Sequence, residues 1–322
     1  MGSVVIAVDV GGTVTKGALV DPSGMVVHAQ RRPTEAARGP DAVRETIVGT
    51  ALDLAAIARA RDLTPVACGV VVPAVIDEDT GIVVFSANLG LRDVPLRDEV
   101  ARRTGLPTLL GHDVRAAATA EARSGAGTGV RRMLFLALGT GIAAAFALDG
   151  TVDPGAHGAS GEIGHVAIRS GPHALPCACG GHGCLERYAS ASAVAAAYAT
   201  EPSPAGAASS TVDAQEVLRR ALAGEQHAAG VWADTVAALA DGLLIGIAVH
   251  DPQLVVLGGG LAQAGDHLLV PLAKQLTRRR TFHQLPDLAV ARFGDEAGCY
   301  GAALLARDAL ARDAGAALSG PA

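Results

Sequence analysis

The chain contains the same short unit twice, about 130 residues apart, and this repeat limits the folds open to it. In the first copy, an apolar run at residues 4–8 meets the turn DVGGT at residues 9–13, and a second strand follows. In the second copy, the apolar run 133–138 meets the turn GTG at residues 139–141, and the strand 142–148 follows. The repeat predicts two related domains that face each other. The alternative is a chance likeness between two short hairpins.

Strands and helices alternate along the rest of the chain, which indicates an α/β fold. Further strands are expected at residues 66–72, 108–110 and 254–257. Helices are expected at residues 41–61, 96–104, 114–123, 186–199, 213–223 and 226–250, from about residue 266, and at 298–312. Residues 200–212, rich in Pro, Ser and Ala, are expected to form a flexible loop.

The composition indicates a globular intracellular protein. Of 322 residues, 50% are apolar and 18% are charged, so the chain can bury a large core and form two domains. The formal net charge of −6 argues against a general binder of nucleic acid or membrane surfaces. No cationic stretch precedes the apolar residues 4–8, so a secretory signal is not expected. The apolar segment 231–250 carries Asp234 and Asp241, which favours a core helix over a membrane span. A cytoplasmic location is therefore expected.

One short stretch, residues 161–188, gathers most of the metal-binding side chains. Its candidate metal ligands are His165, Cys177, Cys179 and Cys184. Three thiolates and one imidazole are a standard ligand set for a closed, tetrahedral zinc site, and inside a cell clustered cysteines favour a metal over a disulfide. Glu162 and Glu186 bracket this cluster, so their carboxylates are available for another task.

Three glycine-rich turns follow apolar strands. Such turns can present backbone N–H groups to phosphates, because glycine permits close approach. The candidate phosphate-binding residues are Asp9, Gly11, Gly12, Thr13, Gly139, Thr140, Gly141, Gly258 and Gly259. The chain has no P-loop signature, and residues 139–141 lack the third glycine of a dinucleotide fingerprint. Glycine also simply makes turns, but the three turns together favour a triphosphate clamped between two domains.

Asp113 is the candidate general base. It lies where a predicted strand meets a predicted helix, and functional groups of α/β folds often project from that edge of the sheet. Phosphoryl transfer to an alcohol needs a carboxylate that accepts the hydroxyl proton. The alternative is an ordinary helix N-cap, because Asp before an alanine-rich helix is a good cap. The neighbouring His112 is interpreted as a substrate contact or as a partly buried histidine.

These motifs together resemble the ROK family of bacterial sugar kinases and related repressors, from near the first residue to near the last. The matching segments are DVGGT (9–13), PAVID (73–77), ANL (87–89), LGTGI (138–142), GEIGH (161–165), CACGGHGCLE (177–186) and LGGG (257–260). The resemblance implies duplicated actin-like or hexokinase-like (ribonuclease H-like) α/β domains around a central cleft. The first would span residues 1–118 plus 295–322, and the second, with the zinc loop, residues 119–294.

The resemblance also implies a role for each site residue. Asp113 would activate a sugar hydroxyl, usually the one on C6. The implied sugar contacts are Asn88, His112, Asp113, Glu162, His165 and Glu186. His165 would also bind zinc with the three cysteines. ATP would place its phosphates on the Gly-Thr turns and its adenosine near residues 257–260, and Asp9 would help to hold Mg²⁺ through water.

Four positions depart from the family pattern. The family usually has Asn at the places of His112 and Arg115, and Gly at the place of Ala74. Residues 143–145 are alanines where glycines are usual, and Lys16 is offered in place of a lysine that is common just after the first turn. These changes leave open the identity of the sugar, and the change in the phosphate turn leaves open the catalytic efficiency.

The leading hypothesis is an ATP-dependent hexose kinase that uses glucose at O6. The alternatives are a kinase for another hexose or an N-acetylhexosamine, such as fructose, N-acetylglucosamine or N-acetylmannosamine, and a catalytically weak sugar sensor. A repressor is disfavoured, because the first strand begins near Val4 and leaves no room for a helix-turn-helix domain. The family resemblance implies a homodimer or homotetramer.

Overall fold

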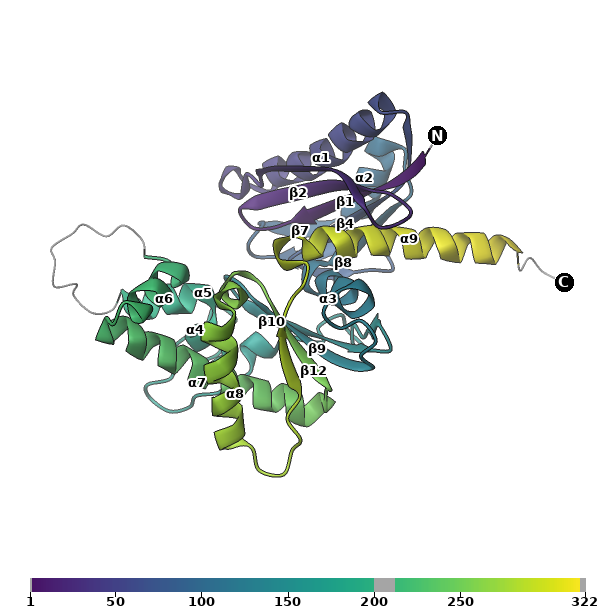
Figure 1. Cartoon of the computed structure of the whole chain (residues 1–322). Helices are drawn as coiled ribbons and strands as arrows, with labels where there is room; N and C mark the ends of the chain where they lie inside the picture. Colours follow the sequence, from purple (N-terminus) through teal and green to yellow (C-terminus); the bar gives the residue numbers. More distant parts are fainter. Residues whose placement is uncertain (1, 200–211, 319–322) are drawn as a thin grey trace. The chain divides into compact units, whose positions relative to one another are not determined.

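The computed structural model describes residues 2–199 and 212–318 (Figure 1). The loop expected at residues 200–212 therefore lies, except for Val212, outside the described residues. The chain forms two compact units. Unit 1 comprises Met1–Ala120, Pro154–Ala159 and Glu296–Ala322, and unit 2 comprises Glu121–Asp153 and Ser160–Asp295. The short segment Pro154–Ala159, which the sequence analysis placed in the second domain, groups with unit 1.

Unit 1 contains a five-stranded sheet in the order β3-β2-β1-β4-β8. The strands are β1 (Gly2–Val10), β2 (Val14–Val20), β3 (Val26–Pro33), β4 (Leu63–Val72) and β8 (Thr108–His112). The first three strands are antiparallel neighbours, whereas β4 pairs in parallel with both β1 and β8. This mixed sheet places the carboxyl ends of β1, β4 and β8 at the same edge.

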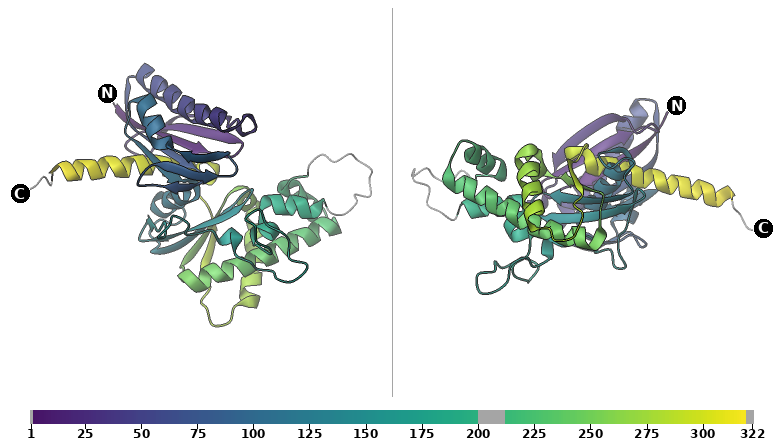
Figure 2. Two further views of the ribbon diagram at one scale, coloured as in Figure 1. Left: turned by 180° about the vertical axis from the view of Figure 1, so that it is seen from behind. Right: turned by 60° about the horizontal axis from the view of Figure 1, so that its bottom comes forward.

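Helices cover both faces of this sheet (Figures 1 and 2). The helices α1 (Pro40–Ala60) and α2 (Leu96–Thr104) pack with one face, and α3 (Asp113–Ser124) and α9 (Ala297–Leu318) pack with the other. Alternate residues of β1 belong to two separate apolar clusters, with Ile6 in one and Ala7 in the other. This explains the uninterrupted apolar run in β1, because a strand covered on both faces has no solvent-facing side.

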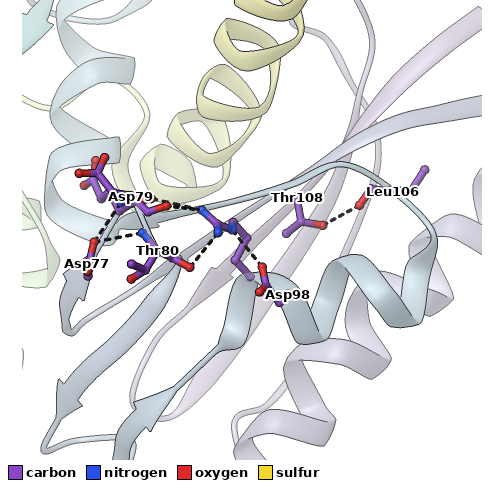
Figure 3. A network of polar contacts seen from close by, with 8 residues as sticks. Asp77, Asp79, Thr80, Asp98, Leu106 and Thr108 are labelled. Carbon is purple, nitrogen blue, oxygen red and sulfur yellow. Dashed lines mark hydrogen bonds and ion pairs between the residues drawn. The ribbon is translucent and has the colours of Figure 1, made fainter.

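A second, smaller sheet of unit 1 was not expected from the sequence. Its antiparallel strands are β5 (Val75–Asp77), β6 (Ile82–Ser86) and β7 (Leu91–Val94). The turn between β5 and β6 is held by Arg97, whose guanidinium donates hydrogen bonds to the carbonyls of Asp79 and Thr80 at 2.9 and 2.8 Å (Figure 3). A long-range side chain therefore fixes a turn that local sequence alone does not define.

Unit 2 repeats the topology of the large sheet. Its strand order is β11-β10-β9-β12-β13. The strands are β9 (Arg132–Leu138), β10 (Ile142–Leu148), β11 (Thr151–Val152), β12 (Leu254–Gly258) and β13 (Asp287–Val290). As in unit 1, three antiparallel strands are followed by two strands that run parallel to the first. The duplication predicted from the two hairpins is confirmed.

The helices of unit 2 are α4 (Glu186–Ala189), α5 (Ala191–Tyr198), α6 (Ala214–Leu222), α7 (Gln226–His250) and α8 (Asp266–Arg279). The single helix expected at residues 186–199 was wrong, because the backbone turns extended at Ser190, whose hydroxyl accepts from the N–H of Ala193 and caps α5. Within the described residues, α7 alone is long and apolar enough to cross a membrane, and 61% of its most apolar window is buried. Its buried side chains belong to the core of unit 2, as expected of a core helix.

Candidate active site

The first glycine turn joins β1 to β2 at the carboxyl edge of the unit 1 sheet. Asp9 and Lys16 lie directly opposite each other in the two strands, and the Lys16 ammonium is 3.5 Å from the Asp9 carboxylate. The same carboxylate lies against the start of α9, where a Cβ at Gly298 would come within 2.4 Å of it. The small residue at position 298 therefore makes room for Asp9, and Lys16 provides a cation beside the first turn.

Asn88 lies beside the same turn. A Cβ built on Gly12 would lie 3.9 Å from the Asn88 Cβ, so the predicted sugar contact and a predicted phosphate contact are neighbours. The Ser86 hydroxyl donates to the Pro73 carbonyl at 2.7 Å and ties the segment before Asn88 to the segment that contains Ala74. Ala74 itself is buried.

His112 ends β8 and Asp113 begins α3. The N–H of Val114 donates to Asp113 Oδ1 at 2.8 Å and to His112 Nδ1 at 3.2 Å, so the two side chains share one donor. An ordinary N-cap accepts from the N–H two or three residues further on, so the Asp113 carboxylate does not make the standard cap bond here. Its side chain retains 28% exposure, so it can reach a substrate.

The environment of Asp113 changes its acidity. Burial raises the pKa of the Asp113 carboxyl to about 6, against the opposing effects of the backbone N–H groups of Val114 and Asp113 and of the Arg115 charge. A carboxylate with a pKa just below neutrality is ionised at pH 7 and is still basic enough to accept a proton. This combination is typical of a general base.

The second and third glycine turns meet at the carboxyl edge of the unit 2 sheet. The strands β9 and β12 are parallel neighbours, so the turns that follow them lie side by side. Gly259 has a φ of +83°, and a Cβ there would lie 2.5 Å from the carbonyl oxygen of Leu138. The close approach of the two turns therefore requires glycine at position 259.

The second turn is also held by residues from the start of two helices. The N–H of Ile142 donates to Glu186 Oε2 at 2.9 Å, and the Ser192 hydroxyl donates to the Thr140 carbonyl at 2.5 Å. Glu186, predicted as a sugar contact, thus lies against the predicted phosphate turn. Ser192 was not predicted as a site residue, although a serine close to the helix-capping Ser190 is a detectable signal.

The GEIGH segment, residues 161–165, packs along β10, the strand that follows the second turn. The N–H of Ala144 donates to the Gly161 carbonyl at 2.7 Å, and Cβ atoms at Gly161 and Gly164 would come within 1.9 and 2.1 Å of the carbonyl oxygens of Ala144 and Ile142. Both glycines therefore allow the segment to pack directly against a strand backbone. This packing fixes Glu162 and His165, which are 3.9 Å apart at their nearest polar atoms.

The four predicted metal ligands are brought together. The ligand atoms of His165, Cys177, Cys179 and Cys184 all lie within 4.8 Å of one another. The sulfurs of Cys179 and Cys184 are 3.6 Å apart, and Cys177 Sγ is 3.7 Å from His165 Nδ1. A tetrahedral zinc with Zn–S bonds of ~2.3 Å places two ligand sulfurs ~3.8 Å apart, whereas a disulfide needs ~2.05 Å. The residues therefore fit a zinc ion.

Residues outside the predicted site anchor the metal-binding loop. Asp241 on α7 accepts from Arg169 Nη1 at 2.8 Å and from Arg279 Nε at 2.9 Å. The Tyr188 hydroxyl accepts from the N–H of Leu175 at 2.8 Å. In the sequence, Asp241 indicated only a core helix. No local pattern pairs it with arginines 72 and 38 positions away.

Each unit thus collects its own part of the predicted site. The residues gathered at the sheet edge of unit 1 are Asp9, Gly11, Gly12, Thr13, Asn88, His112 and Asp113. Those gathered in unit 2 are Gly139, Thr140, Gly141, Gly258, Gly259, Glu162, His165 and Glu186 with the three cysteines. Unit 1 thus combines a glycine turn able to bind phosphate with a basic carboxylate, and unit 2 combines two such turns with a metal-binding loop. These are features of a phosphotransferase on a duplicated α/β fold.

Comparison with known proteins identifies the family. The ROK family matches residues 5–309, and the chain belongs to this family. A glucokinase from Halalkalibacterium halodurans is 33% identical over 324 residues, 94% of either chain. An N-acetylmannosamine kinase from Salmonella typhi is 32% identical over 303 residues, 94% of this chain and 98% of that protein.

A solved structure supports the fold assignment. The crystal structure of a ROK family glucokinase from Streptomyces griseus in complex with glucose and AMPPNP matches with a TM-score of 0.81 and 27% sequence identity. The match covers 95% of this chain and 99% of that one. The predicted actin-like or hexokinase-like α/β fold is confirmed.

Proposed function

We propose that this protein is an ATP-dependent hexose kinase that phosphorylates glucose at the 6-hydroxyl, with Asp113 as the general base. The observation that carries the proposal is the Asp113 carboxylate, which is accessible at the end of β8 and has a pKa of about 6. The glucokinases among the relatives support it, as does the glucose complex of the Streptomyces griseus enzyme.

Asp113 acts on the hydroxyl that attacks the phosphate. The carboxylate accepts the hydroxyl proton while the sugar oxygen forms a bond to the γ-phosphorus. The bond from that phosphorus to the bridging oxygen breaks, and its electron pair leaves with ADP. The shared N–H of Val114 keeps the carboxylate and His112 side by side, so the base is oriented before the sugar binds.

The glycine turns bind the phosphates through backbone N–H groups, and Lys16 adds a positive charge at the first turn. The carboxylate oxygens of Asp9 are the hard ligands that Mg²⁺ prefers, and Asp9 would hold this ion through water. When bound with ATP, Mg²⁺ supplies charge neutralisation for the phosphate oxygens.

Five side chains are the proposed contacts of the sugar hydroxyls. They are Asn88, His112, Glu162, His165 and Glu186. Glu186 Oε2 is already bonded to the N–H of Ile142, which fixes the carboxylate so that its other oxygen accepts from a sugar hydroxyl. Zinc on His165 and the three cysteines would brace the loop, with no direct part in the chemistry.

A coupled ADP-release assay tests the proposal on wild-type protein and on Asp113→Asn. We expect Asp113→Asn to fold and to retain zinc, and to lose roughly 10²–10⁴-fold in kcat, because the amide cannot accept the proton. Thermal unfolding and zinc content serve as controls for the fold. Turnover within a few-fold of wild type would remove Asp113 from the role of base.

A second candidate is an N-acetylhexosamine kinase, because a kinase for N-acetylmannosamine is almost as similar as the glucokinases. The same assay is therefore run with glucose, mannose, fructose, N-acetylglucosamine and N-acetylmannosamine. We expect the highest kcat/KM with glucose. A preference for an N-acetylated sugar would replace glucose in the proposal, and turnover of none of them would favour a sugar-sensing protein.

A further inference from the structure

Arg115 is a buried cation two residues after Asp113, in the first turn of α3. Its side chain is only 9% exposed. Its Nη2 donates to Glu78 Oε1 at 2.7 Å, and its Nη1 donates to the Gly158 carbonyl at 2.9 Å. An unpaired buried charge is costly, so these two acceptors decide where the guanidinium, and with it the start of α3, is held.

Glu78 belongs to the turn between β5 and β6, and hydrogen bonds of this turn are drawn in Figure 3. Asp77 Oδ1 accepts from the N–H groups of Asp79 and Thr80, both at 3.1 Å. From the other side, Arg97 binds the carbonyls of Asp79 and Thr80 and the carboxylate of Asp98. Glu78 is therefore a fixed partner, and the Arg115–Glu78 bond joins this turn to the helix that begins with Asp113.

The charged groups around Asp113 come from three elements. His112 on β8 has its Nδ1 3.3 Å from Asp113 Oδ1. Arg115 on α3 lowers the pKa of Asp113, against the larger effect of burial. Glu78, on the turn after β5, is paired with Arg115 and offsets part of the positive charge that Arg115 exerts on Asp113.

We propose that Arg115 is a positioning residue for Asp113: it fixes the first turn of α3 through Glu78 and Gly158, and its charge favours the carboxylate form of the base. This inference rests on the proposed role of Asp113. The sequence alone offers Arg115 only as a departure from a usual Asn. In the structure, the same residue instead holds the start of α3 and helps to keep a half-buried base ionised at neutral pH.

The test compares the pH dependence of kcat/KM for glucose, or for the sugar that the panel selects, in four variants and wild type. In a plot of kcat/KM against pH, the acidic limb is the rise that follows ionisation of the base. Arg115→Met removes the positive charge, so we expect this acidic limb to move up by about 1 pH unit and kcat to fall several-fold. Arg115→Lys keeps the charge but loses the forked geometry, so kcat falls while the limb stays in place. Glu78→Gln leaves the Arg115 charge less compensated, so the limb moves down.

Arg97→Met is the matched structural control. It loosens the same turn without removing a charge that acts on Asp113, so stability falls while the acidic limb stays near that of wild type. His112→Asn, measured in parallel, removes any titration of His112 from the limb. If Arg115→Met and Arg97→Met lower the melting temperature alike and neither moves the limb, Arg115 is merely structural and the inference is overturned.

A direct titration separates this result from failure of the proposed function. The ¹³C carboxyl resonance of Asp113, identified by its loss in Asp113→Asn, reports the pKa whether or not the protein turns over. We expect this pKa to rise in Arg115→Met and to fall in Glu78→Gln.

An Asp113 pKa that is the same in all of the variants contradicts the inference even if Asp113 proves to be the base. If the pKa moves as expected but Asp113→Asn remains active, the proposed function fails and the electrostatic coupling stands. Should Arg115→Met not fold, the other two variants still test the inference, because the Asp113 pKa should stay unchanged in Arg115→Lys and fall in Glu78→Gln.

Discussion

Single residues set the geometry of the glycine turns, and two adjacent glycines show how differently they contribute. Gly259 combines a φ of +83° with a carbonyl oxygen 2.5 Å from the place of a Cβ, whereas a Cβ on Gly260 would meet nothing within 4 Å. Both belong to one Gly-Gly-Gly run in the sequence. The positive φ of Gly259 and its contact with Leu138, more than 100 positions away, distinguish the two.

Gly259→Ala should therefore destabilise the protein by about 2–3 kcal/mol, because the new methyl group meets both strain and a backbone oxygen. Gly260→Ala is the matched control and should change the stability by less than about 1 kcal/mol. Urea unfolding monitored by fluorescence measures both. Equal losses in the two variants would show that the close approach to Leu138 is not what requires glycine.

At the scale of elements, the sequence predicted those with a strong local signal and missed those that depend on distant partners. Three strands, β1, β9 and β12, were predicted because burial on both faces leaves a continuous apolar run. The helix α7 was predicted from its long apolar segment. The strands β5 to β7 were missed, because they are short, carry charged residues and depend on Arg97 for their turn. The gathering of His165 with the three cysteines was predicted, since four such side chains in 20 residues are a rare pattern, but the anchoring by Asp241 was not.

The metal-binding loop supports a prediction at this scale. Removal of zinc by a chelator should raise the sugar KM and lower the melting temperature, because His165 belongs both to the metal cluster and to the segment that carries Glu162. Metal content measured by mass spectrometry verifies the loss, and added Zn²⁺ should restore both values.

Cys179→Ser, at an exposed ligand position, should reproduce the effect of the chelator in part, whereas Cys299→Ala in unit 1 should keep the zinc. An unchanged sugar KM after verified zinc loss would separate the metal from sugar binding.

At the scale of the whole molecule, two units of the same topology have separate apolar cores. All residues of the largest cluster lie in unit 2, and the other two clusters lie in unit 1. The duplication was predictable from two hairpins that keep the same order of strand, Gly-Thr turn and strand. The grouping of Pro154–Ala159 with unit 1 was not predictable, because the segment contacts residues distant in the sequence, such as Arg115, which donates to the Gly158 carbonyl 43 positions away.

Glu121 tests how independent the two cores are. This buried carboxylate accepts three N–H donors of unit 2, from Ala126 at 2.9 Å, Arg292 at 3.0 Å and Phe293 at 2.8 Å. Glu121→Ala should cost about 3 kcal/mol, since it removes the buried carboxylate that accepts from three partly buried N–H groups. Hydrogen exchange should then accelerate in Glu121–Asp153 and Ser160–Asp295 more than in residues 2–120. A uniform acceleration along the chain would show that the two units unfold together.

The packing of Gly161 and Gly164 against β10 has a consequence for directed evolution of the substrate range. These positions are closed to randomisation, because any side chain there would displace the segment that carries Glu162 from the strand beside it. Diversity belongs instead at position 162 itself and at Ala74 and His112. A library built in this way varies the proposed sugar contacts and keeps the segment 161–165 packed against β10. Loss of activity in its members would then indicate altered sugar binding and not misfolding of that segment.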